Sequence, residues 1–140
     1  MKPLKVFKFI DWVMFPRATL LIVGYTKKEI LKKSAKFPKA WRKLINDYKF
    51  DSNLEVDDDD FNNIIYLPEF NIKNWYYWDS LNHEVRHAID AVVRYDLERD
   101  TELFAYLHEG LFRLCRKEIF KASDKSRKKT KKKVKKKLSH

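Results

Sequence analysis

Positive charge is distributed very unevenly along the 140 residues, and this limits which part of the chain can form a compact fold. The segment 121–140 contains eleven Lys and Arg and one Asp, a net charge of +10. Because the whole chain carries +11, residues 1–120 carry +1. A segment so rich in like charge cannot bury enough apolar surface to fold. We therefore expect one domain over residues 1–120 and a disordered, Lys-rich tail over residues 121–140.

Several classes of protein are excluded by composition. Cys115 is the only cysteine, so an internal disulfide and a cysteine-based zinc knuckle are both ruled out. Lys5, Lys8 and Asp11 interrupt the apolar residues at the N-terminus, which does not resemble a signal peptide. No apolar run approaches the ~18 residues that a membrane helix needs. We expect a soluble, cytoplasmic protein.

In the first half of the chain, strands and short helices are expected. Residues 6–15 and 19–25 are rich in β-branched and aromatic side chains and predict two strands that can pair as a hairpin. Thr26 and Glu29 have the spacing of a capping box, which predicts a helix over residues 26–35. A second helical segment follows at 39–47, then a loop at 50–60 and a strand at 61–67. The expected buried stripe of the two helices is Leu31, Trp41, Leu44 and Ile45.

Two longer helices are expected in the second half. Asn71 or Asn74 can cap a helix that runs to about residue 97. Its apolar residues recur at helical spacing and predict a buried face: Trp75, Trp78, Leu81, Val85, Ala88, Ile89, Val92 and Val93. A last helix over 102–120 buries Phe104, Leu107, Leu111 and Leu114, and its Gly110 indicates a close approach by another backbone segment. Together these elements predict an α+β domain, a small mixed sheet packed on helices.

The first long helix carries the motif His-Glu-x-x-His, with His83, Glu84 and His87. Residues four apart on a helix lie about 40° apart round its axis, so the two imidazoles can bind one zinc ion. Glu84 would lie beside the metal, within reach of a water molecule. With four His and eight Glu in the chain, chance predicts roughly 0.006 such motifs. The alternative is a helix with two ordinary histidines, one of them paired with an acid.

A catalytic zinc site needs a third protein ligand. The candidates that follow the motif are Asp96, Glu98, Asp100, Glu102, His108 and Glu109. We favour Glu102, because it begins the next helix after a connection short enough to fold that helix back. Its alternative role is that of a carboxylate stabilised by the helix dipole. His108 and Glu109 are the next candidates.

The stretch HEVRHAID…TELFAYL resembles the zincin metallopeptidases, in particular the gluzincins, and the layout also resembles small zincin-like proteins of bacteriophages. The resemblance implies a minimal zinc peptidase that acts on a protein or peptide substrate. It implies that His83, His87 and Glu102 are the zinc ligands and that Glu84 is the general base. It also implies that residues 63–67, in the string NIIYLP, form the strand that pairs with extended substrate.

Other side chains are candidates for supporting roles in such a site. Asp79 or Asp90 can orient a ligand histidine, although Asp90 can equally pair with Arg86 or Arg94. Tyr66, Tyr106 and His108 are candidate donors to the oxyanion. The aromatic run 75–78 can line a pocket, but such a cluster is more often part of the core.

We expect the basic tail, residues 121–140, to contact nucleic acid or another polyanion by nonspecific neutralisation of phosphates. An anionic membrane surface, a nuclear-type address and a merely solubilising tail are the alternatives. Three hypotheses result. The first is a zinc peptidase brought to nucleic acid or to a virion by its tail, and the second is a non-catalytic zincin-like binding or virion-associated module that contacts nucleic acid. The third is a helical nucleic-acid-binding protein in which the motif is accidental. If the chain is encoded by a phage, we expect it to be associated with the virion.

Overall fold

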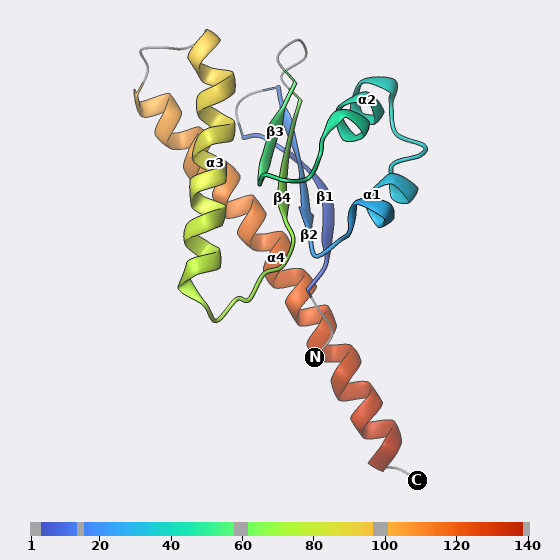
Figure 1. Cartoon of the computed structure of the whole chain (residues 1–140). Helices are drawn as coiled ribbons and strands as arrows, with labels where there is room; N and C mark the ends of the chain where they lie inside the picture. The colour runs from blue at the N-terminus through green and yellow to red at the C-terminus, as the bar shows by residue number, and fades with distance from the viewer. Residues whose placement is uncertain (1–3, 14–15, 58–61, 97–100, 139–140) are drawn as a thin grey trace.

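The computed structural model describes residues 4–13, 16–57, 62–96 and 101–138. Within these residues the elements are β1 (Val6–Asp11), β2 (Ala18–Val23), α1 (Lys27–Lys33), α2 (Lys39–Asp47), β3 (Leu54–Val56), β4 (Asn63–Leu67), α3 (Trp75–Asp96) and α4 (Thr101–Leu138). Helices α1 and α2 cover one face of the sheet, and α3 and α4 cover the other (Figure 1). The predicted α+β class, a small mixed sheet packed on helices, is confirmed.

The described strands form one sheet in the order β1-β2-β4-β3. β1 and β2 are antiparallel neighbours, which confirms the predicted hairpin. β2 and β4 are parallel, and β3 is antiparallel to β4. Because the two central strands are covered on both faces, they are continuous apolar runs with little alternation, ATLLIV and NIIYL.

Two hydrophobic cores lie on opposite faces of this sheet. Leu20 and Ile22 of β2 point towards α1 and α2, whereas Leu21 and Val23 point towards α3 and α4. The same alternation holds in β4, since successive strand residues point to opposite faces. The core beneath α3 and α4 therefore holds α3 against the centre of the sheet.

A buried polar chain joins β2, β4 and the segment after β1 at the end of the sheet where β2 begins. Thr19 is fully buried and accepts a hydrogen bond from the Trp12 indole N–H at 2.8 Å. Its own hydroxyl donates to Asn63 Oδ1 at 2.5 Å. These bonds connect the segment after β1 to β2 and β4, so they fix the register of the strands on which α3 packs.

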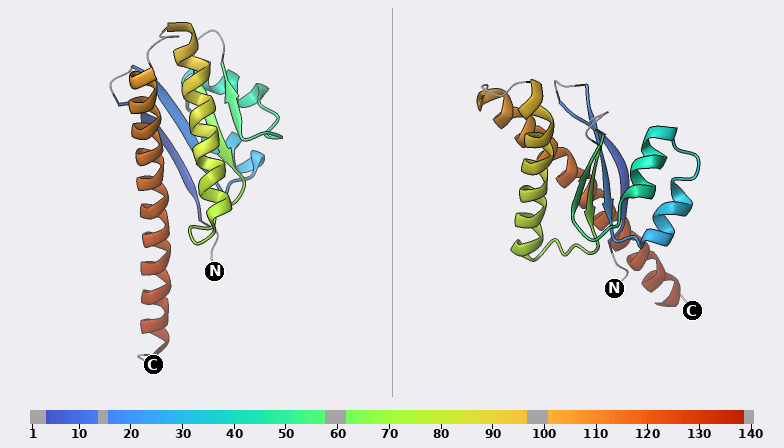
Figure 2. Two further views of the ribbon diagram at one scale, coloured as in Figure 1. Left: turned by 90° about the vertical axis from the view of Figure 1, so that its left-hand side faces the viewer. Right: turned by 45° about the horizontal axis from the view of Figure 1, so that its top comes forward.

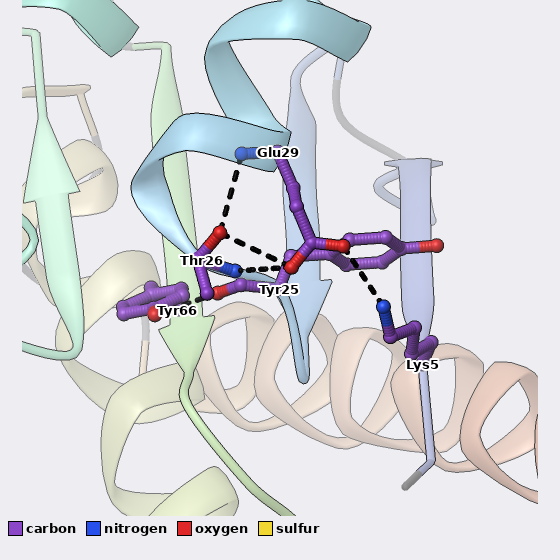
Figure 3. Close-up of polar contacts among 5 residues, drawn as sticks. All are labelled: Lys5, Tyr25, Thr26, Glu29 and Tyr66. Atoms are coloured by element: carbon purple, nitrogen blue, oxygen red, sulfur yellow. Dashed lines mark hydrogen bonds and ion pairs between the residues drawn. The ribbon is translucent and has the colours of Figure 1, made fainter. Parts of the chain in front are cut away.

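The predicted capping box at the start of α1 is confirmed (Figure 3). The Glu29 backbone N–H donates to Thr26 Oγ1 at 3.3 Å, and the Thr26 N–H donates to the Glu29 carboxylate at 3.0 Å. Lys5 completes the cluster with an ion pair to Glu29 at 2.9 Å. The hydrogen bond from Lys5, followed by that from the Thr26 backbone, lowers the pKa of Glu29 from its ordinary value to about 2.

The expected helical stripe of α1 and α2 is right for α2 and wrong by one residue for α1. Leu44 and Ile45 are buried and Trp41 is partly buried, as predicted. In α1, Ile30 is fully buried, while Leu31 is 37% exposed. The seven-residue helix is too short for its sequence to show clearly which side faces the sheet.

The prediction of a continuous loop over residues 50–60 is wrong, because it contains β3. This strand has three residues, and each is only partly buried, so its sequence carries too few alternating positions to reveal it. β3 pairs with β4 through Leu54–Ile65, Glu55–Ile64 and Val56–Asn63.

Helix α3 begins after Asn74, whose side chain accepts a hydrogen bond from the Tyr76 N–H at 3.0 Å. Asn71 instead accepts from the Lys73 N–H, so Asn74 is the residue at the helix start. The predicted inner face is confirmed for Leu81, Val85, Ala88 and Ile89, all fully buried. Trp78 is partly buried, whereas Trp75 is 80% exposed. The side chains of residues 92 and 93 lie outside the described ones.

Helix α4 buries Leu107, Leu111, Cys115 and Ile119, while Phe104 and Leu114 are partly buried against the same core. At Gly110 a Cβ atom would lie 3.2 Å from the Val13 side chain, so the close approach is made by a side chain and not by the expected backbone. None of the helices in the described part of the chain combines the length and apolar character that a membrane crossing requires.

The structure continues α4 to Leu138, whereas the sequence predicts a disordered tail from residue 121. Beyond the sheet the helix extends away from the rest of the domain (Figure 2). Packing also passes the predicted boundary at residue 120, because Ala122 contacts the core and Ser123 is buried. Lys and Arg are good helix formers, residues 121–140 contain no Gly or Pro, and an existing helix needs no new nucleus. We call residues 121–138 the α4 extension.

Candidate metal site

His83 and His87 lie one turn apart on α3, and their side chains converge as predicted. The two Nε2 atoms are 3.0 Å apart, and the ring centroids are 4.4 Å apart. At this separation the two Nε2 atoms are within hydrogen-bond distance of each other. The spacing of four residues thus brings both imidazole nitrogens together beside α3.

The pair projects from the side of α3 that faces away from the core. Val85 is fully buried, and it lies two residues from each histidine, which corresponds to about 160° round the helix. Both histidines are correspondingly exposed. The hydrophobic contacts of Val85 thus fix the rotation of α3 that turns both imidazoles to solvent.

The spacing of the two nitrogens fits a pair of zinc ligands. Two nitrogens each ~2.0–2.1 Å from a tetrahedral zinc ion lie about 3.3–3.4 Å apart. The observed 3.0 Å differs from this by a few tenths of an ångström, which small side-chain rotations supply. Imidazole nitrogens are also preferred zinc ligands, so both chemistry and geometry match at these two positions.

Glu84 lies beside the pair on the same helix. It is partly buried, and it stands about 60° round the axis from His87. A carboxylate at this position can accept a proton from a water molecule held near the imidazoles. The position agrees with the general-base role that the resemblance implies.

Glu102 lies in the first turn of α4, as predicted, but its exposed side chain is not brought to the pair. The described residues contain no group of three or more His, Cys, Asp or Glu that could hold a metal ion. Glu102 lies about 180° round α4 from the fully buried Leu111, on the solvent side of the helix. Glu98 and Asp100 lie outside the described residues.

His108, one of the other candidates, is the α4 side chain that approaches the motif. Its Nε2 is 3.5 Å from the carbonyl oxygen of Asn82, the residue before His83, and its ring is parallel to that of Phe104. His108 is partly buried, since it lies where the two helices meet. It does not complete a three-ligand group with His83 and His87.

The candidate oxyanion donors are separated by the sheet. Tyr66 lies on the α1–α2 side, where its hydroxyl donates to the Tyr25 carbonyl at 2.8 Å (Figure 3). It is therefore across the sheet from α3, so Tyr66 is excluded from the three candidate donors. Tyr106 is 63% exposed on α4, and His108 is closer to the motif.

The expectation that residues 63–67 pair with extended substrate is also wrong. These residues form β4, which is hydrogen-bonded to β2 on one side and to β3 on the other. No edge of β4 is free for a peptide. All five residues are buried, and a nearly continuous apolar sequence such as NIIYL is typical of a central strand. The edge on this side of the sheet is β3, which also contacts α3.

The two acids expected to orient the histidines, Asp79 and Asp90, are both exposed on α3. Each lies within one turn of a motif histidine, so their supporting role stays a prediction. The alternative pairing of Asp90 with Arg94 involves a side chain outside the described ones.

Trp75 and Trp78, from the aromatic run at the start of α3, line a surface hollow, which is the less favoured of the two roles expected for the run. The hollow has a volume of about 470 Å³ and lies between the start of α3 and the middle of α4. Its wall is built from aromatic and basic side chains: Lys73, Trp75, Trp78, Phe112, Arg116 and Phe120. The sequence indicates the α4 wall of this hollow only by a repeat, in which Phe112, Arg116 and Phe120 recur every four residues on one predicted helix.

Comparison of the chain with protein-family models, with curated proteins and with solved structures finds no match.

Proposed function

We propose that this chain binds zinc through His83 and His87 and is a zinc-dependent peptidase of minimal size. The observation that carries the proposal is the exposed pair of Nε2 atoms, 3.0 Å apart on a helix that also bears Glu84. The resemblance to the gluzincins supplies the reaction, hydrolysis of a peptide bond. We place the protein in the cytoplasm, or in the virion if a phage encodes it.

When bound at such a pair, zinc polarises a carbonyl group and makes a water molecule more acidic. The two imidazoles would hold the ion, and the packing of α3 through Val85 keeps their orientation fixed. Glu84 accepts the proton of the attacking water and returns it to the leaving amine. The open side of α3 admits an extended peptide, since both histidines are exposed.

Two measurements test the two parts of this proposal. Native mass spectrometry should find one zinc ion per chain, lost in His83→Ala and in His87→Ala. His140→Ala, which removes a histidine outside the motif, is the matched control and should keep the zinc. If the two motif variants bind zinc as tightly as the wild type, the proposed zinc site is wrong.

The second measurement is hydrolysis of an unfolded protein substrate. Glu84→Gln should abolish cleavage with its zinc retained, and a chelator followed by added zinc should remove and restore cleavage in the wild type. A zinc-loaded wild-type protein with no cleavage that depends on Glu84 would contradict the peptidase role.

A second candidate, a non-catalytic zinc-holding module, is favoured by one observation. Within the described residues the pair has no third ligand, whereas a catalytic zinc site has three protein ligands. If zinc binds but Glu84→Gln changes no hydrolysis, this alternative is the one supported. Its role would then be contact with nucleic acid.

We further propose that the α4 extension contacts a polyanion. Lys125, Arg127, Lys128 and Lys132 are all exposed along it. Phosphate contacts by such a helix release counterions, so binding must weaken steeply as the salt concentration rises. Full-length protein with these four residues changed to Gln should lose most of its affinity for heparin and for nucleic acid.

A further inference from the structure

We infer that the hollow between α3 and α4 binds an unstacked base of a single-stranded nucleic acid, while the α4 extension follows the phosphate backbone. The inference rests on the polyanion contact proposed for the extension, but it is independent of the zinc site. It names the partner more closely, because a base can enter the hollow only if it is not paired within a duplex.

The hollow has a fixed aromatic floor and an exposed aromatic wall. Trp78 is held by a hydrogen bond from its indole N–H to the Ile72 carbonyl at 2.8 Å, and it stacks on Phe120 with ring centroids 5.4 Å apart. Trp75, by contrast, is 80% exposed at the rim. An indole so exposed offers a free face for stacking, and Trp78, which is already held in place, costs little entropy when a base binds.

The charge of the hollow matches a nucleotide better than an uncharged ligand. Among the described residues that line it, Lys73 and Arg116 are cations and none is acidic. Stacking platforms flanked by basic groups are the common design of proteins that bind single strands. A neutral apolar peptide would use the aromatic rings but would gain nothing from the two cations.

The hollow is also continuous with the α4 extension. Arg116 and Phe120 lie on the same helix as the extension, which begins at the next residue. Arg127 is exposed and lies eleven residues after Arg116, within about 20° of it round the axis and about 16 Å along it. A strand whose base occupies the hollow can therefore place neighbouring phosphates along this stripe of α4.

The test uses the full chain and three probes: labelled oligothymidylate, a DNA duplex with the same number of phosphates, and heparin, which has no bases. Trp75→Ala should weaken binding of oligothymidylate about fivefold or more, as expected for one stacked base, and should leave heparin binding unchanged. Trp75→Phe should restore most of the affinity. Tyr76→Ala removes a neighbouring aromatic ring that is 70% exposed and does not line the hollow, and it should have no effect.

Arg116→Gln should weaken oligothymidylate binding and make it less dependent on salt, whereas Arg113→Gln, an exposed residue of the same helix, should do so less. Equal binding of oligothymidylate by the wild type and by Trp75→Ala would overturn the inference. So would equal losses for all three probes. If the change of four extension residues to Gln alters no probe, the proposed polyanion contact fails instead, so the two failures are distinguishable.

Discussion

The two faces of α3 should be separable by mutation, because one packs and the other carries the proposed site. Val85 is fully buried, and Val85→Ala removes two methyl groups from the core. Their transfer is worth about 1.6 kcal/mol at ~0.8 kcal/mol per buried carbon, and the cavity left behind raises the cost. We expect the free energy of unfolding to fall by about 2–3 kcal/mol. That is a large part of a total stability that is typically 5–15 kcal/mol.

His83→Ala should change zinc binding and leave the free energy of unfolding nearly unchanged. The ring is exposed, so its loss should change the stability of the metal-free protein by no more than about 0.5 kcal/mol. Zinc binding, however, should be lost. Val85→Ala should bind zinc as the wild type does at temperatures where it is fully folded, because the imidazoles lie about 160° away on the helix.

Urea denaturation in the presence of a chelator, followed by tryptophan fluorescence, measures the stabilities. Competition with a chromophoric chelator measures zinc affinity. Arg86→Ala, an exposed change between the two histidines, is the control for both assays. If His83→Ala destabilises the metal-free protein as much as Val85→Ala does, the ring packs in the interior and the described orientation of α3 is refuted.

Three further predictions follow from other parts of the structure. Thr19→Val removes two buried hydrogen bonds and should lower the free energy of unfolding by about 1–3 kcal/mol, measured by urea denaturation, whereas Thr19→Ser should keep both bonds and most of the stability. The pKa of Glu29 is lowered to about 2 in the folded chain, so this carboxylate stabilises the fold above its ordinary pKa of 4.5. That contribution should be lost as the pH falls from 4.5 towards 2, and Lys5→Gln should reduce the slope of an acid-denaturation curve in this range. Burial raises the pKa of the Cys115 thiol to about 12, so a thiol reagent at pH 8 should react with this residue only after unfolding; rapid reaction in the native protein would show that α4 is not packed there.

The elements most accurately predicted from the sequence were those fixed by local chemistry. The capping box at Thr26 and Glu29 and the bounds of α2 depend on neighbouring residues, and both are found in the structure. β3 was missed because three partly buried residues show no pattern. The central place of β4 depends on its parallel pairing with β2, some forty residues earlier, which no local pattern contains. Helical periodicity likewise could not show where α4 ends, since Lys-rich sequence fits both an extended helix and a disordered tail.

Local sequence patterns also predict only part of the candidate site. The i,i+4 spacing of His83 and His87 was enough to predict their convergence, because both belong to one helix. Their outward direction was also implied in the sequence, since the apolar stripe through Val85 lies on the other side. The third ligand was different, because Glu102 belongs to another helix and its direction depends on how that helix rotates against α3. That rotation is set by Leu107 and Leu111, which the sequence marks as apolar without showing what they meet.

The position of Glu102 on α4 decides whether it can serve the pair. Glu102 and Phe120 are eighteen residues apart, five full turns at ~3.6 residues per turn, so they lie on the same side of α4. Phe120 stacks on Trp78 near the start of α3, whereas Glu102 lies in the first turn of α4. In the described residues no acid joins the two histidines in a three-ligand group, so the zinc affinity of the pair should not depend on Glu102. Glu102→Gln should therefore bind zinc as the wild type does, and a loss of zinc affinity in this variant would show that Glu102 is a ligand.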